Sequence, residues 1–113
     1  MSASELEDIF AAQLDAVGLD GYVREYKAIP GRRFRFDFAF TQPEHRLLIE
    51  VQGGVWSGGA HGRPTGITRD MDKLNQAQIY GWKVLQFDTK MVKSGAALEV
   101  VEKLIGGDHA DQR

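Results

Sequence analysis

The chain has 113 residues, a net charge of −2 at pH 7, 42% hydrophobic residues and 27% charged residues. This composition is typical of a globular domain, and the net charge gives no global signal for nucleic acid, although a local basic patch is sufficient for phosphate contacts. No cysteine is present, which excludes disulfides, thiolate metal sites and cysteine nucleophiles. No apolar run approaches the roughly 20 residues of a membrane span. We therefore expect one cytoplasmic domain over residues 1–105, no membrane association, and a frayed tail over residues 106–113.

The first predicted element is a helix over residues 4–17. Ser4 is a good N-cap, and Glu7 completes a capping-box pattern three residues later. The predicted buried stripe consists of Leu6, Ile9, Phe10, Leu14 and Val17. Glu7 lies at the edge of this stripe on a helical wheel and can face the rest of the fold. Capping and catalysis both stay open for it.

Three strands are expected next, over residues 22–27, 33–40 and 47–52, and the last two alternate strictly. In residues 33–40 the phenylalanines at even positions share one face, and Arg35, Asp37 and Ala39 share the other. In residues 47–52 the odd positions are apolar, and Leu48, Glu50 and Gln52 share the opposite face. A four-residue loop over 42–45 would form a hairpin with Thr41 opposite Arg46.

This register places Asp37 directly opposite Glu50. Directly opposed residues have Cβ atoms roughly 4.5–5.5 Å apart, and like charges there are destabilising. A divalent cation between the two carboxylates would turn the repulsion into binding. The alternative is that one acid faces water and pairs with Arg33 or Arg35. These arginines are either phosphate-positioning groups or part of a charged sheet rim.

The segment over residues 53–66 is unusual, because six of its fourteen residues are glycine. A loop of this length without secondary structure is usually functional or disordered. Trp56, His61 and Arg63 are residue types that stack on bases, ligate metals or bind phosphate. An exposed histidine without a role is the alternative for His61.

A second helix is predicted over residues 68–80, with Thr68 as N-cap and Gly81 just beyond its end. Its predicted inward stripe is Ile67, Met71, Leu74, Ala77 and Gln78. Arg69 and Lys73 are expected to point outward. A short strand over 82–87 and a final helix over 95–105 complete the chain.

The predicted order αβββαβα indicates an α/β fold with a mixed four-stranded sheet flanked by helices. With this order, the chain resembles the small PD-(D/E)XK nucleases, which have a restriction-endonuclease-like core. It resembles most the short phage and prophage type related to the virus-type replication-repair (VRR-NUC) and very-short-patch repair endonucleases. The matching pieces are RFRFDF at 33–38, IEVQGG at 49–54, the glycine-rich loop with its histidine, DKLN at 72–75 and GWKVLQF at 81–87. The resemblance spans about residues 4–105.

The resemblance implies that Asp37 and Glu50 are the motif acids that bind Mg²⁺ or Mn²⁺, with Glu7 as an extra ligand. Gln52 occupies the position where the family most often has lysine. Its amide has no charge and cannot act as a base, but it can orient a water molecule. Lys73 is a candidate for the absent positive charge, although its outward wheel position favours a surface salt bridge.

We therefore expect a Mg²⁺-dependent DNA endonuclease, a phosphodiester hydrolase of phage or prophage DNA processing or repair. The expected catalytic residues are Asp37, Glu50, Gln52 and Lys73. The expected DNA contacts are Arg33, Arg35, Trp56, His61, Arg63 and Arg69. The departure at Gln52 leaves open a catalytically degenerate nucleic-acid-binding module on the same fold, and a structural or assembly protein is the third alternative. A homodimer would serve double-strand cleavage.

Overall fold

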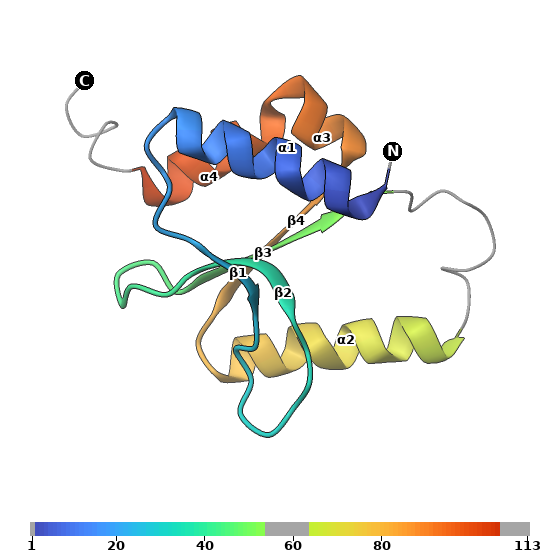
Figure 1. Ribbon diagram of the computed structural model, residues 1–113. Helices are drawn as coiled ribbons and strands as arrows, with labels where there is room; N and C mark the ends of the chain where they lie inside the picture. The colour runs from blue at the N-terminus through green and yellow to red at the C-terminus, as the bar shows by residue number, and fades with distance from the viewer. Residues whose placement is uncertain (1, 54–63, 107–113) are drawn as a thin grey trace.

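The computed structural model describes residues 2–53 and 64–106. Four strands form a mixed sheet in the order β1-β2-β3-β4, with antiparallel β1–β2 and β2–β3 pairs and a parallel β3–β4 pair. The elements are α1 (Ala3–Ala16), β1 (Val23–Tyr26), β2 (Phe36–Phe40), β3 (Leu47–Gln52), α2 (Pro64–Ile79), β4 (Lys83–Asp88), α3 (Thr89–Ser94) and α4 (Ala96–Ile105). Figure 1 shows α1, α3 and α4 on one face of the sheet and α2 alone on the other. In the part of the chain that is described, no helix combines the length and apolarity that crossing a membrane requires.

Helix α1 begins earlier than expected. Ser2, not Ser4, is the N-cap: the Ser2 hydroxyl accepts from the Glu5 N–H, and the Ser2 N–H donates to the Glu5 carboxylate. The spacing Ser-x-x-Glu occurs twice in this stretch, at Ser2–Glu5 and at Ser4–Glu7, and both satisfy the capping-box pattern. Because the first pair caps the helix, Glu7 lies inside it and is free for another role.

The predicted hairpin register is confirmed, since Phe38, Ala39 and Phe40 pair with Ile49, Leu48 and Leu47. The face assignment of β3 also holds, because Leu47, Ile49 and Val51 join the core under α1 while Leu48 joins the core over α2. Strand β2 is shorter than predicted and starts at Phe36.

The face assignment of Phe36 is wrong. Phe36 packs with Ala39 on the α2 side, whereas Phe38 and Phe40 pack on the α1 side. Strict alternation therefore breaks at Asp37. Glu25, which the β1–β2 register sets opposite Asp37, has a positive φ of 52° and is missing from the paired residues. This left-handed backbone interrupts the regular ladder, and the alternation is lost at the same level of the sheet.

The two hydrophobic cores differ in size. The α1-side core consists of Leu6, Phe10, Ala11, Leu14, Phe38, Phe40, Leu47, Ile49, Val51, Phe87, Val92, Ala97 and Val101. The α2-side core consists of Ile29, Phe36, Ala39, Leu48, Ala77 and Trp82. Most of the apolar burial thus lies between the sheet and the helices α1, α3 and α4.

Helix α2 begins at Pro64, about one turn before the predicted N-cap Thr68. Proline is favoured in the first turn of a helix, where its missing N–H costs no hydrogen bond. The predicted inward stripe is largely wrong: Met71 is 60% exposed, Ile67 is 42% exposed, and Gln78 is also exposed. Of that stripe, Ala77 is buried and Leu74 is half-buried.

A short helix that the sequence analysis missed, α3, lies between β4 and α4. The Asp88 carboxylate caps it by accepting from the Met91 N–H at 2.9 Å. Gly95, with φ of 87°, ends α3 and begins α4 at the predicted position. Aspartate is among the best N-caps, so Asp88 was the available signal for this helix.

Candidate metal and nucleic-acid site

Asp37 lies where the β2–β3 ladder ends. The paired residues end at Phe38 and Ile49, and two residues further along β3 the N–H of Val51 donates to Asp37 Oδ2 at 2.7 Å. The carboxylate thus takes the place of a strand carbonyl between β2 and β3. Burial is the main cause that raises the pKa of Asp37, and the hydrogen bond from Val51 opposes the rise.

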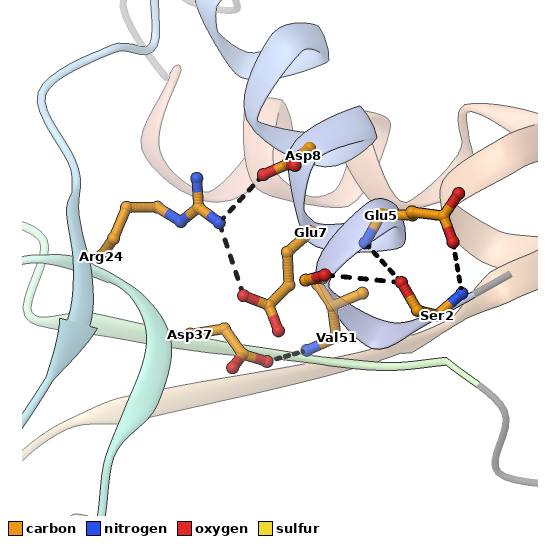
Figure 2. Close-up of polar contacts among 8 residues, drawn as sticks. Ser2, Glu5, Glu7, Asp8, Arg24, Asp37 and Val51 are labelled. Carbon is orange, nitrogen blue, oxygen red and sulfur yellow. Dashed lines mark hydrogen bonds and ion pairs between the residues drawn. The ribbon is translucent and has the colours of Figure 1, made fainter.

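Three carboxylates from three elements meet around Asp37. Glu7 of α1, Glu25 of β1 and Asp37 of β2 each place a carboxylate oxygen within 4.8 Å of the others. Figure 2 shows Glu7 extending from α1 toward Asp37. Burial, and then the charges of Asp37 and Glu25, raise the pKa of Glu7. For both Glu7 and Asp37, burial is the largest cause of the raised pKa, and the charge of Glu25 adds to it.

Arg24 is the cation beside this acidic group. Its Nη2 lies 3.4 Å from Glu7 Oε1 and 3.5 Å from Asp8 Oδ1 (Figure 2). The guanidinium also lies 4.8 Å from the ring centroid of Phe38. Arg24 therefore compensates part of the charge of Glu7. Among the described residues, Asp37 and Glu25 form no salt bridge.

Glu50 has a different partner. Lys73 Nζ lies 2.8 Å from Glu50 Oε1, and both side chains are only about 15% exposed. Lys73 Nζ also donates to the Arg35 carbonyl at 2.5 Å and lies 4.5 Å from the ring centroid of Phe36. The outward orientation predicted for Lys73 is therefore wrong. The predicted inward face of the helix was based on Ile67 and Met71, which are exposed. The prediction therefore placed Lys73 on the solvent side, whereas Lys73 faces the sheet.

The pairing of Asp37 with Glu50 is only partly as predicted. The register sets them opposite each other, and the charge of Asp37 helps burial to raise the pKa of Glu50, against the opposing effect of Lys73. The three acids that come together, however, are Glu7, Glu25 and Asp37 rather than Glu7, Asp37 and Glu50. The side chain of Glu50 turns to Lys73 on α2, and that of Asp37 to the acids on the α1 side.

Sequence reasoning missed Glu25. Strand β1 has four residues, three of them exposed, so it lacks the apolar alternation that would have fixed its register. Without that register, nothing in the sequence indicates that Glu25 lies opposite Asp37.

Three of the four arginines predicted to contact DNA, Arg33, Arg35 and Arg69, line one pocket. A hollow of about 690 Å³ lies between the segment leading into β2 and the first half of α2. Its lining residues are Gly31, Arg32, Arg33, Phe34, Arg35, Arg69, Asp70 and Lys73. Arg32 is fixed by an ion pair with Asp72 and lies 4.5 Å from the ring centroid of Phe34. We call this hollow the basic pocket.

The other residues predicted for the site are Gln52, Trp56, His61 and Arg63. Gln52 is exposed at the end of β3. Trp56, His61 and Arg63 lie outside the described residues. Comparisons with protein-family models, with curated proteins and with solved structures find no match for this chain.

The acidic group fits a hard divalent cation. Such cations take carboxylate oxygens at about 2.0–2.6 Å, so oxygens within 4.8 Å of one another can share one ion. The basic pocket fits an anion, because arginine guanidinium groups bind phosphate with paired N–H groups. Lys73 lines the pocket and contacts Glu50, and its charge also lowers the pKa of Asp37, against the larger effect of burial.

Proposed function

We propose that this protein is a metal-dependent DNA endonuclease that hydrolyses phosphodiester bonds. The observation that carries the proposal is the position of Lys73, which borders both the carboxylates and the basic pocket. A phosphate bound by the pocket's cations would therefore lie next to Glu50 and close to Asp37. Phosphodiester hydrolysis needs this juxtaposition of anionic ligands and phosphate-binding cations.

In the proposed reaction, Glu7, Glu25 and Asp37, whose carboxylate oxygens lie within 4.8 Å of one another, hold the metal. Glu50 becomes a further ligand when it separates from Lys73. A bound Mg²⁺ or Mn²⁺ supplies Lewis acidity, which lowers the pKa of water and offsets the charge of the phosphate. The chain's own contribution is to position the DNA, with Arg33, Arg35 and Arg69 as the phosphate contacts.

Lys73 supplies the positive charge that Gln52 lacks, and the exposed amide of Gln52 is available to orient water. Residues 2–53 and 64–106 hold one such site, so cleavage of both strands would require two copies. A role in phage or prophage DNA processing rests on the sequence resemblance alone.

Nicking of supercoiled plasmid in the presence of Mg²⁺ or Mn²⁺ tests the proposal. Asp37→Asn and Glu50→Gln should each reduce the nicking rate at least about 100-fold, which corresponds to roughly 2.7 kcal/mol. Glu102→Gln, which neutralises an exposed acid of α4, is the matched control and should cut like the wild type. Equal nicking by all four proteins would rule out the assignment.

A second candidate is a nucleic-acid-binding module without catalysis. It is favoured by the Glu50–Lys73 ion pair, which already compensates one of the two motif acids, and by Gln52 in place of lysine. Calorimetric titration with Mn²⁺ separates the two candidates. DNA binding without metal binding would support the module, whereas metal binding lost in Asp37→Asn would support the enzyme.

A further inference from the structure

Lys73 is held by three different groups. Its ammonium contacts Glu50 Oε1 at 2.8 Å, the Arg35 carbonyl at 2.5 Å and the face of Phe36 at 4.5 Å. An ammonium has three N–H donors, and the two oxygen atoms accept from two of them. The ring face attracts the positive charge itself. Both side chains of the ion pair are largely buried, at 15% and 14% exposure. Water therefore screens the pair weakly, and the two charges attract each other more than they would on an open surface.

This arrangement makes Lys73 a competitor of any cation at Glu50. A divalent ion at Glu50 would share the charge of one carboxylate with Lys73, and the ammonium 2.8 Å from Oε1 would repel the ion. Glu50 therefore binds a divalent ion together with Asp37 more tightly once Lys73 has moved away.

The basic pocket offers Lys73 another partner. Lys73 is one of its lining residues, with Arg33, Arg35 and Arg69 close by. Asp70 also lines the pocket and offsets one of these charges, so the lining keeps a net positive charge that favours an anion. A DNA phosphate in the pocket would attract the flexible lysine side chain toward itself and away from Glu50.

We propose that Lys73 is an exchangeable counter-ion of Glu50, which a DNA phosphate draws into the basic pocket so that Glu50 becomes available to the metal. DNA and metal then bind cooperatively, and the free protein binds metal weakly. The inference rests on the proposed function and concerns the regulation of the same site. By thermodynamic linkage, DNA tightens metal binding by the same factor by which metal tightens DNA binding.

Calorimetric titration of the full-length protein with Mn²⁺, without DNA, tests the competition. Lys73→Met should bind Mn²⁺ about 10-fold more tightly than the wild type, within the usual range of coupling between sites. Lys73→Gln, which keeps a donor for the Arg35 carbonyl but no charge, should show the same gain. Lys103→Met, which removes an exposed charge of α4, should bind like the wild type. Equal or weaker Mn²⁺ binding by Lys73→Met and Lys73→Gln would overturn the inference.

The wild type alone provides a second test that does not depend on the folding of a variant. Its titration with Ca²⁺, another cation that takes oxygen ligands, is repeated with a duplex oligonucleotide that a gel shows to be intact. The duplex should tighten Ca²⁺ binding about 10-fold, and unchanged Ca²⁺ affinity would overturn the inference. Metal-dependent nicking together with unchanged affinity would leave the proposed function standing. No cation binding under any condition would instead remove both.

Discussion

The two faces of the sheet are built on different principles. On the α1 side, three helices bury a continuous apolar core in which the rings of Phe10, Phe38 and Phe87 meet at centroid distances of 5.4 and 5.7 Å. On the α2 side, one helix covers a smaller core, and charged side chains supply much of its attachment. The α1 side thus supplies most of the hydrophobic stabilisation of the fold, and the α2 side can hold charged groups that are partly buried.

The attachments of α2 illustrate this difference. Arg32 pairs with Asp72, Lys73 pairs with Glu50, and Arg46 donates to the carbonyls of Tyr80 and Gly81 at the end of the helix. A half-exposed ion pair such as Arg32–Asp72 contributes little to stability compared with apolar burial. For a largely buried pair such as Lys73–Glu50, the cost of desolvation offsets much of the attraction between the charges. We infer that these cations position α2 over the sheet, and that the hydrophobic core on the other face carries most of the folding energy.

The largest predicted effect tests this division directly. Phe10→Ala removes a fully buried ring from the α1-side core and should lower the free energy of unfolding by about 3–5 kcal/mol. Met71→Ala on α2 removes a side chain that is 60% exposed and should change it by less than about 0.5 kcal/mol. Urea denaturation measures both. Similar losses for the two variants would show that the two faces contribute equally.

A smaller effect concerns the start of α1, which decides whether Glu7 is a cap or a site residue. Ser2→Ala removes the observed N-cap and should cost about 1 kcal/mol, whereas Ser4→Ala, within the first turn, should cost far less. Thermal denaturation of the two variants compares them on the same scale. A larger cost for Ser4→Ala would shift the helix start and return Glu7 to a capping role.

The parts of the fold that could be predicted are those with a strong local pattern. Strands β2 and β3 alternate apolar and polar residues, and one register satisfies both, so the pairing of Phe38 with Ile49 followed from sequence. Lys73 could not be placed, because Ile67 and Met71 are apolar residues on the exposed side of α2 and mislead a helical wheel. Glu25 depends on a left-handed backbone conformation that is uncommon for glutamate and has no sequence signature.

Three of the departures from sequence-based expectation lie around the candidate site. Phe36 faces the α2 side instead of the predicted α1 side, and Glu25 has a left-handed backbone conformation. Asp37 accepts a hydrogen bond that a strand carbonyl would otherwise accept. Functional sites are where local rules are most often broken at some cost in stability. That cost is measurable at Asp37.

The smallest predicted effect is a pH-dependent gain of stability in Asp37→Asn. Burial raises the pKa of Asp37 above its ordinary value of 3.8, so the folded protein binds this proton more tightly than the unfolded chain does. Wild-type stability therefore falls as the pH rises from the unfolded value through the raised folded value. Asparagine carries no charge and can still accept from the Val51 N–H, so the variant should be more stable at neutral pH, on the order of 0.5 kcal/mol.

Melting temperatures of the two proteins between pH 3 and pH 7 give the sign of this difference. They should be equal at pH 3, where both side chains are neutral, and diverge in favour of Asp37→Asn as the pH rises. Glu5→Gln provides a control of opposite sign, because the hydrogen bond from the Ser2 N–H lowers the pKa of Glu5 and stabilises its charged form. That variant should match the wild type at low pH and be less stable at neutral pH. If Asp37→Asn is the less stable protein at pH 7, the Asp37 carboxylate supports the fold, and the inference that the candidate site around Asp37 costs stability is wrong.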